Sequence, residues 1–176
     1  DHPEWAGRVM LTRRAEMLPV EAIVRGYVSG SAWREYSTAG TIHHMAAPEG
    51  LVESAQLPQP MYTPSTKAAV GDHDENIPFE RMAEIVGQKR AEELRAVSLA
   101  IYKAAAEHAS ACGLILADTK FEFGERDGKI IWIDEALSPD SSRYWLQETY
   151  REGVAQDSFD KQVVRDYLDG VKWDRT

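Results

Sequence analysis

The sequence predicts a fold that combines antiparallel strands with packed helices, and three stretches of the chain carry this prediction. Residues 114–134 alternate apolar and charged side chains around a tight loop, which is typical of a β-hairpin. Residues 20–28 are apolar enough to form a further strand, whereas residues 88–112 repeat apolar side chains at helical spacing. A chain of 176 residues fits one domain and can bury roughly 70% of its unfolded surface.

Charge and composition exclude several classes of function. The 29 acidic residues outnumber the 20 basic ones and give a net charge of −9, whereas nucleic-acid and acidic-membrane binders need a basic field. We find neither a signal-peptide pattern nor an apolar run near the ~20 residues of a membrane span. The lone Cys112 cannot form an internal disulfide, so we expect a buried thiol and a cytoplasmic location. The expected partners are small molecules, with no nucleic acid and no membrane.

The strand predicted over residues 20–28 carries one arginine among apolar residues. Glu21, Ile23 and Arg25 share one face of this strand, because side chains alternate between faces. A buried arginine requires an anion. That anion is either Glu21 or a bound ligand, and the strand alone leaves both open.

A short helix is predicted over residues 32–36. Ser31 stands at the N-cap position, and most serines there only cap, although a helix start also offers its amides to a phosphate or carboxylate. Residues 37–66 are rich in Gly and Pro and are predicted to be a loop, whose length of about 30 residues usually has a functional cause. His43 and His44 lack a third ligand at metal spacing, so we expect them at the surface.

Two polar runs follow this loop, at 63–67 and 71–78. The run from His73 to Asn76 looks like a set of metal ligands, but consecutive side chains cannot all converge on one ion. Helix-start chemistry accounts for residues 74–76 and for Pro78. It leaves three polar residues without an explanation: Lys67, Asp72 and His73.

Two helices are predicted next, over residues 79–86 and 88–112. Gly87 breaks or bends the first, and Gly113 ends the second as a C′ glycine. The longer helix carries a stripe that we expect to pack inward: Leu94, Val97, Ile101, Ala105, His108 and Cys112.

The hairpin presents one charged face and one apolar face. Asp118, Lys120 and Glu122 share the charged face, and the residues between them point the other way. A two-residue turn at 127–128 would put Glu122 and Asp134 on opposite faces, whereas a three-residue loop would put them on the same face.

We predict the three-residue loop, which makes Glu122 and Asp134 diagonal neighbours with β-carbons about 7 Å apart. Two carboxylates at that separation can hold one Mg²⁺ together with water and phosphate oxygens. The alternative is a solvated face with no ligand. In this register Ile130 and Trp132 share the face, so it is partly buried and its carboxylates need a partner. The turn after the hairpin then brings Arg143 close in sequence to Asp134.

Taken together, these residues resemble one family, phosphoribosylaminoimidazole-succinocarboxamide synthase, or SAICAR synthetase. The matching strings occur in the family's order and span most of the chain: MLPVEAIVRGYVSGSAW (17–33), LPQPMYTPSTKA (57–68), GDHDENI (71–77), GLILADTKFEFG (113–124), IDEALSPDSSRYW (133–145) and SFDKQ (158–162). The resemblance implies an α+β fold, in which a small ATP-binding lobe adjoins a larger ATP-grasp-like domain with an antiparallel sheet and packed helices. Residues 1–19 would form the last part of the ATP-binding lobe and the hinge, and residues 20–176 would form the substrate- and metal-binding domain.

The resemblance implies a ligase of de novo purine biosynthesis. Its reaction joins the carboxylate of 5-aminoimidazole-4-carboxy ribonucleotide (CAIR) to L-aspartate, with cleavage of ATP to ADP and phosphate and with Mg²⁺ as cofactor. It leaves open whether the protein is a homo-oligomer. Two alternatives remain: another ATP-dependent carboxylate-amine ligase with a different acceptor, and a non-catalytic nucleotide-binding domain of the same fold.

The same resemblance implies roles for individual residues. Glu122 and Asp134 would bind Mg²⁺ and, with it, the ATP, while Met17 and Leu18 would contact adenine. Lys120 and Asp118 would lie beside the reacting groups. The substrate nucleotide and the aspartate would be bound by Arg25, Ser31, Arg143, Lys67, Asp72, His73 and Asp74.

The sequence departs from the family at its start. Family members begin with a Gly-rich hairpin and a lysine that cover the ATP phosphates, and nothing before Asp1 supplies them. No initiator Met precedes Asp1, so we expect a piece of a longer polypeptide, with the N-terminal ATP lobe largely absent. We expect the isolated 1–176 chain to bind ATP poorly and to show no turnover.

Overall fold

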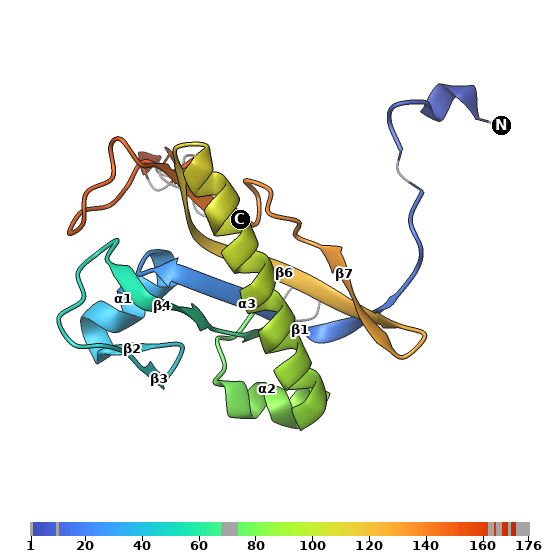
Figure 1. The fold of residues 1–176 in the computed structure, drawn as a ribbon, viewed down its shortest axis with the longest axis horizontal. Helices are drawn as coiled ribbons and strands as arrows, with labels where there is room; N and C mark the ends of the chain where they lie inside the picture. The colour runs from blue at the N-terminus through green and yellow to red at the C-terminus, as the bar shows by residue number, and fades with distance from the viewer. Residues whose placement is uncertain are drawn as a thin grey trace.

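A six-stranded antiparallel sheet forms the centre of the computed structural model, which describes residues 2–9, 11–67, 74–161, 164, 167, 168, 170 and 171 (Figure 1). The strand order is β4-β1-β6-β7, and β5 also pairs with β1 while β8 pairs with β6. The strands are β1 (Glu16–Tyr27), β4 (Gln56–Tyr62), β5 (Ser65–Thr66), β6 (Leu114–Arg126), β7 (Lys129–Asp134) and β8 (Ser142–Leu146). The expected α+β character is therefore confirmed.

Helices cover one face of this sheet. The helix α3 (Gln88–Ala111) crosses β1 and β6, and α2 (Phe79–Val86) lies at its N-terminal end (Figure 1). The helix α1 (Gly30–Ala39) and a small sheet of β2 (Thr41–Ile42) and β3 (Met45–Ala46) lie at the far end of β1. A 3₁₀ helix, η1 (Pro3–Trp5), stands away from the sheet. None of the described helices is long and apolar enough to cross a membrane.

Alternation along β1 and β6 separates a core face from a charged face. Val24 pairs with Thr119 and Ala22 with Phe121, and these residues are buried in the core against α3. The intervening pairs must point the other way. They are Arg25 with Asp118, Ile23 with Lys120, and Glu21 with Glu122.

The hairpin of β6 and β7 has a two-residue turn, so the predicted three-residue loop is wrong. Asp127 and Gly128 both have positive φ, at 52° and 72°, and Arg126 pairs with Lys129. This register would separate Glu122 from Asp134.

A β-bulge brings the two carboxylates back together. Phe123 pairs with Trp132 but Glu122 pairs with Asp134, so Ile133 is an extra residue in β7. Glu122 and Asp134 are therefore direct cross-strand partners. Trp132 lies on the core side, where its ring meets Phe121 edge-on at 5.2 Å between centroids, and the expectation that it shares the carboxylate face is wrong.

Two further expectations fail between β1 and β5. The helix α1 starts at Gly30 with Ser29 as its N-cap residue, so Ser31 is not the cap. The stretch predicted as a loop contains β4, with Pro58 and Pro60 inside it. β4 lies at an edge of the sheet, where a missing proline N–H breaks no ladder bond.

The two helices after this region follow the prediction at their ends. Gly87 and Gly113 both have positive φ, at 86° and 77°, as a break and a C′ glycine require. The fully buried residues of α3 are Ala91, Leu94, Ser98, Tyr102 and Ala109. Most of the predicted stripe packs on the core, namely Leu94, Val97, Ile101 and Ala105, whereas His108 is exposed. Cys112 is exposed, so the expected buried thiol is wrong. The proposed domain boundary after residue 19 falls within β1 and stays a prediction.

Candidate functional site

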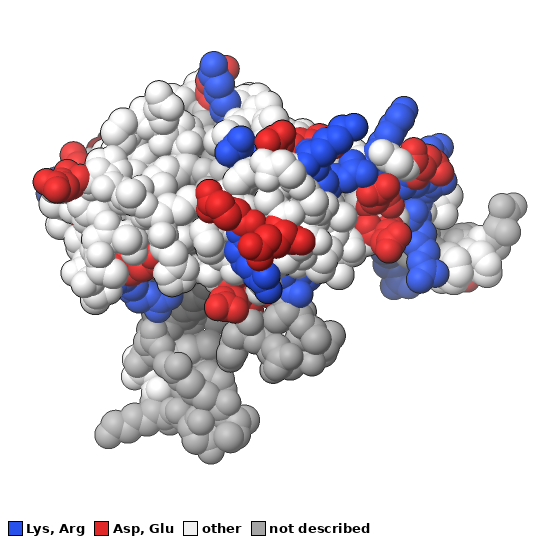
Figure 2. All heavy atoms as spheres, turned by 90° about the horizontal axis from the view of Figure 1, so that it is seen from below, with Lys and Arg blue, Asp and Glu red and all other residues white. Residues whose placement is uncertain are grey.

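The charged face of β1 and β6 carries two adjoining sets of side chains. We call Arg25, Asp118 and Arg143 the arginine cluster, and Glu21, Lys67, Lys120, Glu122 and Glu135 the lysine cluster. Both lie on the side of the sheet opposite α3, because their pairs alternate with the core pairs. Elsewhere charge is mixed: on the face shown in Figure 2, Lys and Arg lie among Asp and Glu without a broad area of one sign.

In the arginine cluster, one carboxylate oxygen joins two guanidinium groups. Arg25 Nη1 donates to Asp118 Oδ2 at 3.2 Å, and Arg143 Nη1 donates to the same oxygen at 2.7 Å. Ser29 Oγ donates to it as well, at 3.2 Å. The anion that Arg25 requires is therefore Asp118 from β6 rather than Glu21.

Arg25 is almost completely enclosed, with 4% of its surface exposed. Its Nε donates to Thr63 Oγ1 and its Nη2 to Ser31 Oγ, each at 3.2 Å. Burial lowers the pKa of Arg25, and the carboxylate of Asp118 opposes that effect. The side chain nevertheless stays a cation at neutral pH, since the ordinary arginine pKa lies far above neutrality.

Arg143 reaches the same place from β8. Its Nε lies 3.6 Å from Asp160 Oδ2, and a β-carbon built at Gly30 would lie 2.6 Å from its Nη2. The guanidinium thus packs directly on the first residue of α1. The charge of Asp118 raises the pKa of Arg143, which keeps it protonated.

His43 belongs beside this cluster, although the sequence placed it at the surface. Its side chain is fully buried, and its Nε2 lies 3.1 Å from Arg25 Nη2. The backbone at His43 is left-handed, with φ of 49°, which turns the side chain inward. Nothing in the neighbouring sequence marks such a conformation in a residue other than glycine.

The lysine cluster follows along the same strands. Lys120 Nζ donates to Glu21 Oε1 at 2.7 Å and lies 3.3 Å from Glu135 Oε1. Lys67 Nζ donates to Glu122 Oε1 and lies 3.5 Å from Glu21 Oε1. Glu21 and Glu135 were not among the predicted site residues, because neither stands in a pattern that marks a site.

The lysine cluster carries more negative than positive charge, which suits it to a cation. Three glutamates against two lysines leave one negative charge, and the partner of Glu122, Asp134, adds another. Burial lowers the pKa of Lys120 and of Lys67, but the neighbouring carboxylates outweigh it and raise both. Both lysines are therefore cations at neutral pH, a state in which they cannot serve as bases.

The carboxylates suit a divalent cation only with ligands from outside the chain. Within the described residues, no group of three or more His, Cys, Asp or Glu side chains could hold a metal ion. Glu122 and Asp134 together offer two carboxylates, and Asp134 Oδ1 also accepts a bond from the amide of Glu135 at 2.8 Å. Mg²⁺ commonly takes one or two carboxylates and completes its shell with water and phosphate oxygens, so the pair fits that ion.

The remaining predicted residues belong to neither cluster or lie outside the described part. Met17, half exposed, and Leu18, packed against the core, begin β1 where it pairs with Gly124. Asp74 is exposed. Asp72 and His73 lie outside the residues that the structure describes.

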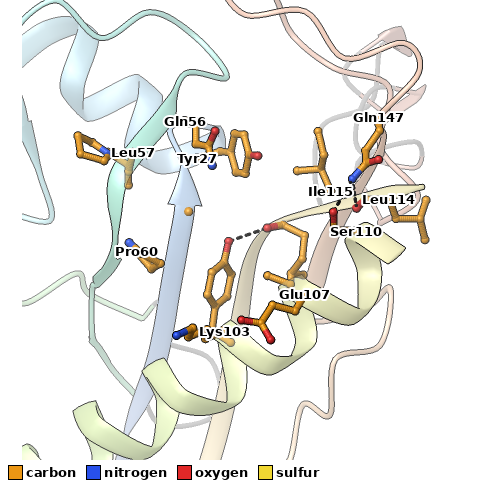
Figure 3. A pocket seen from close by; sticks show the side chains of 15 residues that line it. Tyr27, Gln56, Leu57, Pro60, Lys103, Glu107, Ser110, Leu114, Ile115 and Gln147 are labelled. Atoms are coloured by element: carbon orange, nitrogen blue, oxygen red, sulfur yellow. Dashed lines mark hydrogen bonds between the residues drawn. The ribbon is translucent and has the colours of Figure 1, made fainter. Parts of the chain in front are cut away.

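A separate cavity of about 480 Å³ opens on the other side of the sheet (Figure 3). It lies between β4, the C-terminal half of α3 and the start of β6, with Tyr27, Lys103, Glu107 and Gln147 around it. Tyr102 at its floor donates to the carbonyl of Leu116 at 2.7 Å. None of the predicted site residues that the structure describes lines it, so we place the candidate site at the two charged clusters.

Comparisons with known proteins agree on one family. The sequence model described as SAICAR synthetase matches residues 3–176. The phosphoribosylaminoimidazole-succinocarboxamide synthase of Syntrophotalea carbinolica is 57% identical over 169 residues, which cover 96% of this chain and 57% of that protein. The enzyme of the same name from Pelobacter propionicus is 56% identical over 170 residues, covering 97% of this chain and 57% of that protein. The chain thus spans a little over half the length of these relatives.

Solved structures give the same answer. The SAICAR-synthase of Saccharomyces cerevisiae complexed with SAICAR is 44% identical, with a TM-score of 0.80, and the match covers 89% of this chain and 51% of that one. A SAICAR synthetase in complex with ADP is 28% identical, with a TM-score of 0.70, over 90% of this chain and 59% of that one.

Proposed function

The chain belongs to the SAICAR synthetase family, and from that premise we propose that its residues serve an ATP-dependent ligase that joins CAIR to L-aspartate. The products are SAICAR, ADP and phosphate, and the reaction belongs to purine synthesis in the cytoplasm. The observation that carries the proposal is the pair of clusters on β1 and β6. There, two guanidinium groups meet at Asp118 beside a set of carboxylates with excess negative charge.

The reaction needs this combination of charges. A carboxylate is a poor electrophile for an amine, and phosphorylation gives it a leaving group. The transfer gathers negative charge from ATP, the nucleotide and the amino acid in one place, which calls for cations fixed in advance.

The arginine cluster is assigned to the substrate nucleotide. Arg25 and Arg143 would bind its carboxylate or phosphate, because a guanidinium fork binds two oxygens at once. Ser31 would add a hydroxyl. Asp118 holds both guanidinium groups at one oxygen, so it keeps them pointed at the same region before substrate arrives.

The lysine cluster is assigned to the phosphoryl transfer. Lys120 would stabilise the charge that develops on the transferred group, since its ammonium is held by Glu21 and Glu135. Lys67 would neutralise Glu122 until the nucleotide binds. Glu122 and Asp134 would hold Mg²⁺, which supplies charge neutralisation at the phosphate oxygens. Met17 and Leu18 would contact adenine, and Asp72, His73 and Asp74 would complete the substrate sites.

Replacing Glu122 tests this assignment in the full-length enzyme. Glu122→Gln removes the charge of a metal ligand but keeps its shape, so ADP release dependent on CAIR and aspartate should fall at least a hundredfold. Glu92→Gln is the matched control, because Glu92 is exposed on α3 and its bond from Gln88 needs only an oxygen. Unchanged rates in Glu122→Gln would refute its role as a metal ligand, whereas absence of this ADP release from the unsubstituted enzyme would favour a non-catalytic domain.

The amine acceptor is tested separately. ADP release should require L-aspartate, and glutamate or asparagine should not replace it. Equal rates with another amino acid would point to a carboxylate-amine ligase of different specificity.

A further inference from the structure

His43 and Glu35 form a connected pair that the proposed function does not use. Glu35 projects from α1, and its carboxylate bonds to the turn that joins β2 to β3. His43 lies in that turn and reaches Arg25. The pair therefore links α1 to the arginine cluster.

The turn is strained and Glu35 holds it. His43 and His44 both have left-handed backbones, with φ of 49° and 60°, a conformation that costs energy for residues other than glycine. The Glu35 carboxylate accepts bonds from both of their amides, at 3.0 and 2.7 Å, and from Thr41 Oγ1 at 2.7 Å. Burial raises the pKa of Glu35, but these bonds lower it below its ordinary value, so the carboxylate stays ionised.

The neighbours of His43 select one form of its ring. Nδ1 lies 3.2 Å from the carbonyl oxygen of Pro64, which only accepts, so Nδ1 carries the hydrogen. Nε2 lies 3.1 Å from Arg25 Nη2, which only donates, so Nε2 must be the unprotonated acceptor. An imidazolium would set a second hydrogen against a guanidinium.

The charges around His43 agree with this form. Burial and the charge of Arg25 lower its pKa to about 4, and His44 adds to that effect, while the Pro64 carbonyl and Glu35 oppose it. The ring is thus neutral at physiological pH.

We propose that His43 is a positioning residue for substrate binding, because its neutral Nε2 fixes the plane of the Arg25 guanidinium while Glu35 holds the turn that presents it. This inference rests on the proposed function, in which Arg25 binds the nucleotide. Arg25 has bonds in four directions, to Thr63, Asp118, Ser31 and His43. Removal of the His43 bond leaves Nη2 with the Ser31 hydroxyl, and the guanidinium can then tilt.

Two substitutions separate the two ring bonds in the full-length enzyme. His43→Asn places an amide near the Nδ1 position, so the Pro64 bond survives and the Arg25 bond is lost. His43→Gln places an oxygen near the Nε2 position, so the Arg25 bond survives. We expect His43→Asn to raise KM for CAIR about tenfold, the size of one lost hydrogen bond to a charged group, with KM for ATP within about twofold. His43→Gln should raise KM for CAIR no more than about threefold.

Equal rises in the KM for CAIR in both variants, or a parallel rise in the KM for ATP, would overturn the proposal and leave His43 a purely structural residue. Glu35→Gln should act in the same direction as His43→Asn but more weakly, because one amide oxygen can still accept a bond from the turn.

A measurement on the unmodified protein covers the case in which the variants fail to fold. Nitrogen-15 NMR of the imidazole should show hydrogen on Nδ1 and none on Nε2 down to about pH 5. Hydrogen on Nε2 at neutral pH would refute the positioning role whatever the kinetics show. If the unmodified enzyme does not consume CAIR, the proposed function fails, and the NMR result still decides the state of His43.

Discussion

Gly30 is the point at which a single added carbon should disturb the arginine cluster. A β-carbon there would lie 2.6 Å from Arg143 Nη2 and 2.9 Å from its Cζ, and the backbone has a φ of +57°. Gly30→Ala therefore has two effects, a strained backbone and displacement of the guanidinium. Gly40, at the other end of α1, has a φ of +71° and no atom within 4 Å of an added β-carbon. Gly40→Ala therefore has only the first effect and is the matched control.

The magnitudes of the two effects differ enough to measure. A left-handed alanine costs roughly 1–2 kcal/mol at either position. Moving Arg143 away from Asp118 sacrifices a bond of 2.7 Å between two largely buried charged groups, which is worth about 1.5–3 kcal/mol. We expect Gly40→Ala to lower the free energy of unfolding by roughly 1–2 kcal/mol and Gly30→Ala by roughly 2.5–5 kcal/mol.

Urea unfolding of the full-length enzyme, followed by tryptophan fluorescence, measures both losses. The double variant with Arg143→Ala isolates the clash, since Gly30→Ala should cost no more than Gly40→Ala once the guanidinium is gone. Substrate binding gives a second readout, because KM for CAIR should rise in Gly30→Ala and stay unchanged in Gly40→Ala. Equal losses of stability at the two glycines would refute the packing of Arg143 on α1.

Two further predictions concern stability. In the unfolded chain His43 takes up a proton at its ordinary pKa of 6.5, whereas in the folded protein its pKa is about 4. The free energy of unfolding should therefore fall by up to about 3 kcal/mol as the pH drops from 6.5 to 4. Urea unfolding at several pH values should show this loss, and His43→Gln should lack it; a loss of equal size in the variant would assign it to other groups. Tyr102→Phe leaves the carbonyl of Leu116 without its donor and should cost about 1–3 kcal/mol in the same assay, with ligase activity unchanged because the site lies across the sheet.

The faces of the central strands could be predicted because alternation is a local property. Arg25, Asp118, Lys120 and Glu122 occupy the expected face, since a strand allows each side chain only two directions. The partner of Arg25 could not be predicted, because it depends on which strand lies beside β1 in space. Arg143 was predicted from its nearness in sequence to Asp134 and from the family resemblance, and the pairing of β8 with β6 is what places it on Asp118.

Register and backbone handedness account for most of the failures. The length of the turn at Asp127 was misjudged because both lengths suit an Asp-Gly pair, and the bulge at Ile133 has no sequence mark. His43 was misplaced because its left-handed backbone depends on Glu35, eight positions earlier. Pro58 suggested a loop because proline disfavours strands, yet an edge strand accepts it.

The extra residue in β7 has a consequence for how this hairpin can change length. Ile133 has no partner of its own in β6, so deleting it would leave Asp134 next to Trp132 in sequence and still opposite Glu122. A bulge bends its strand and increases the local twist, so the shortened β7 would be straighter and would leave the sheet in a different direction toward β8. The hairpin can therefore lose this one residue without turning Asp134 to the core side.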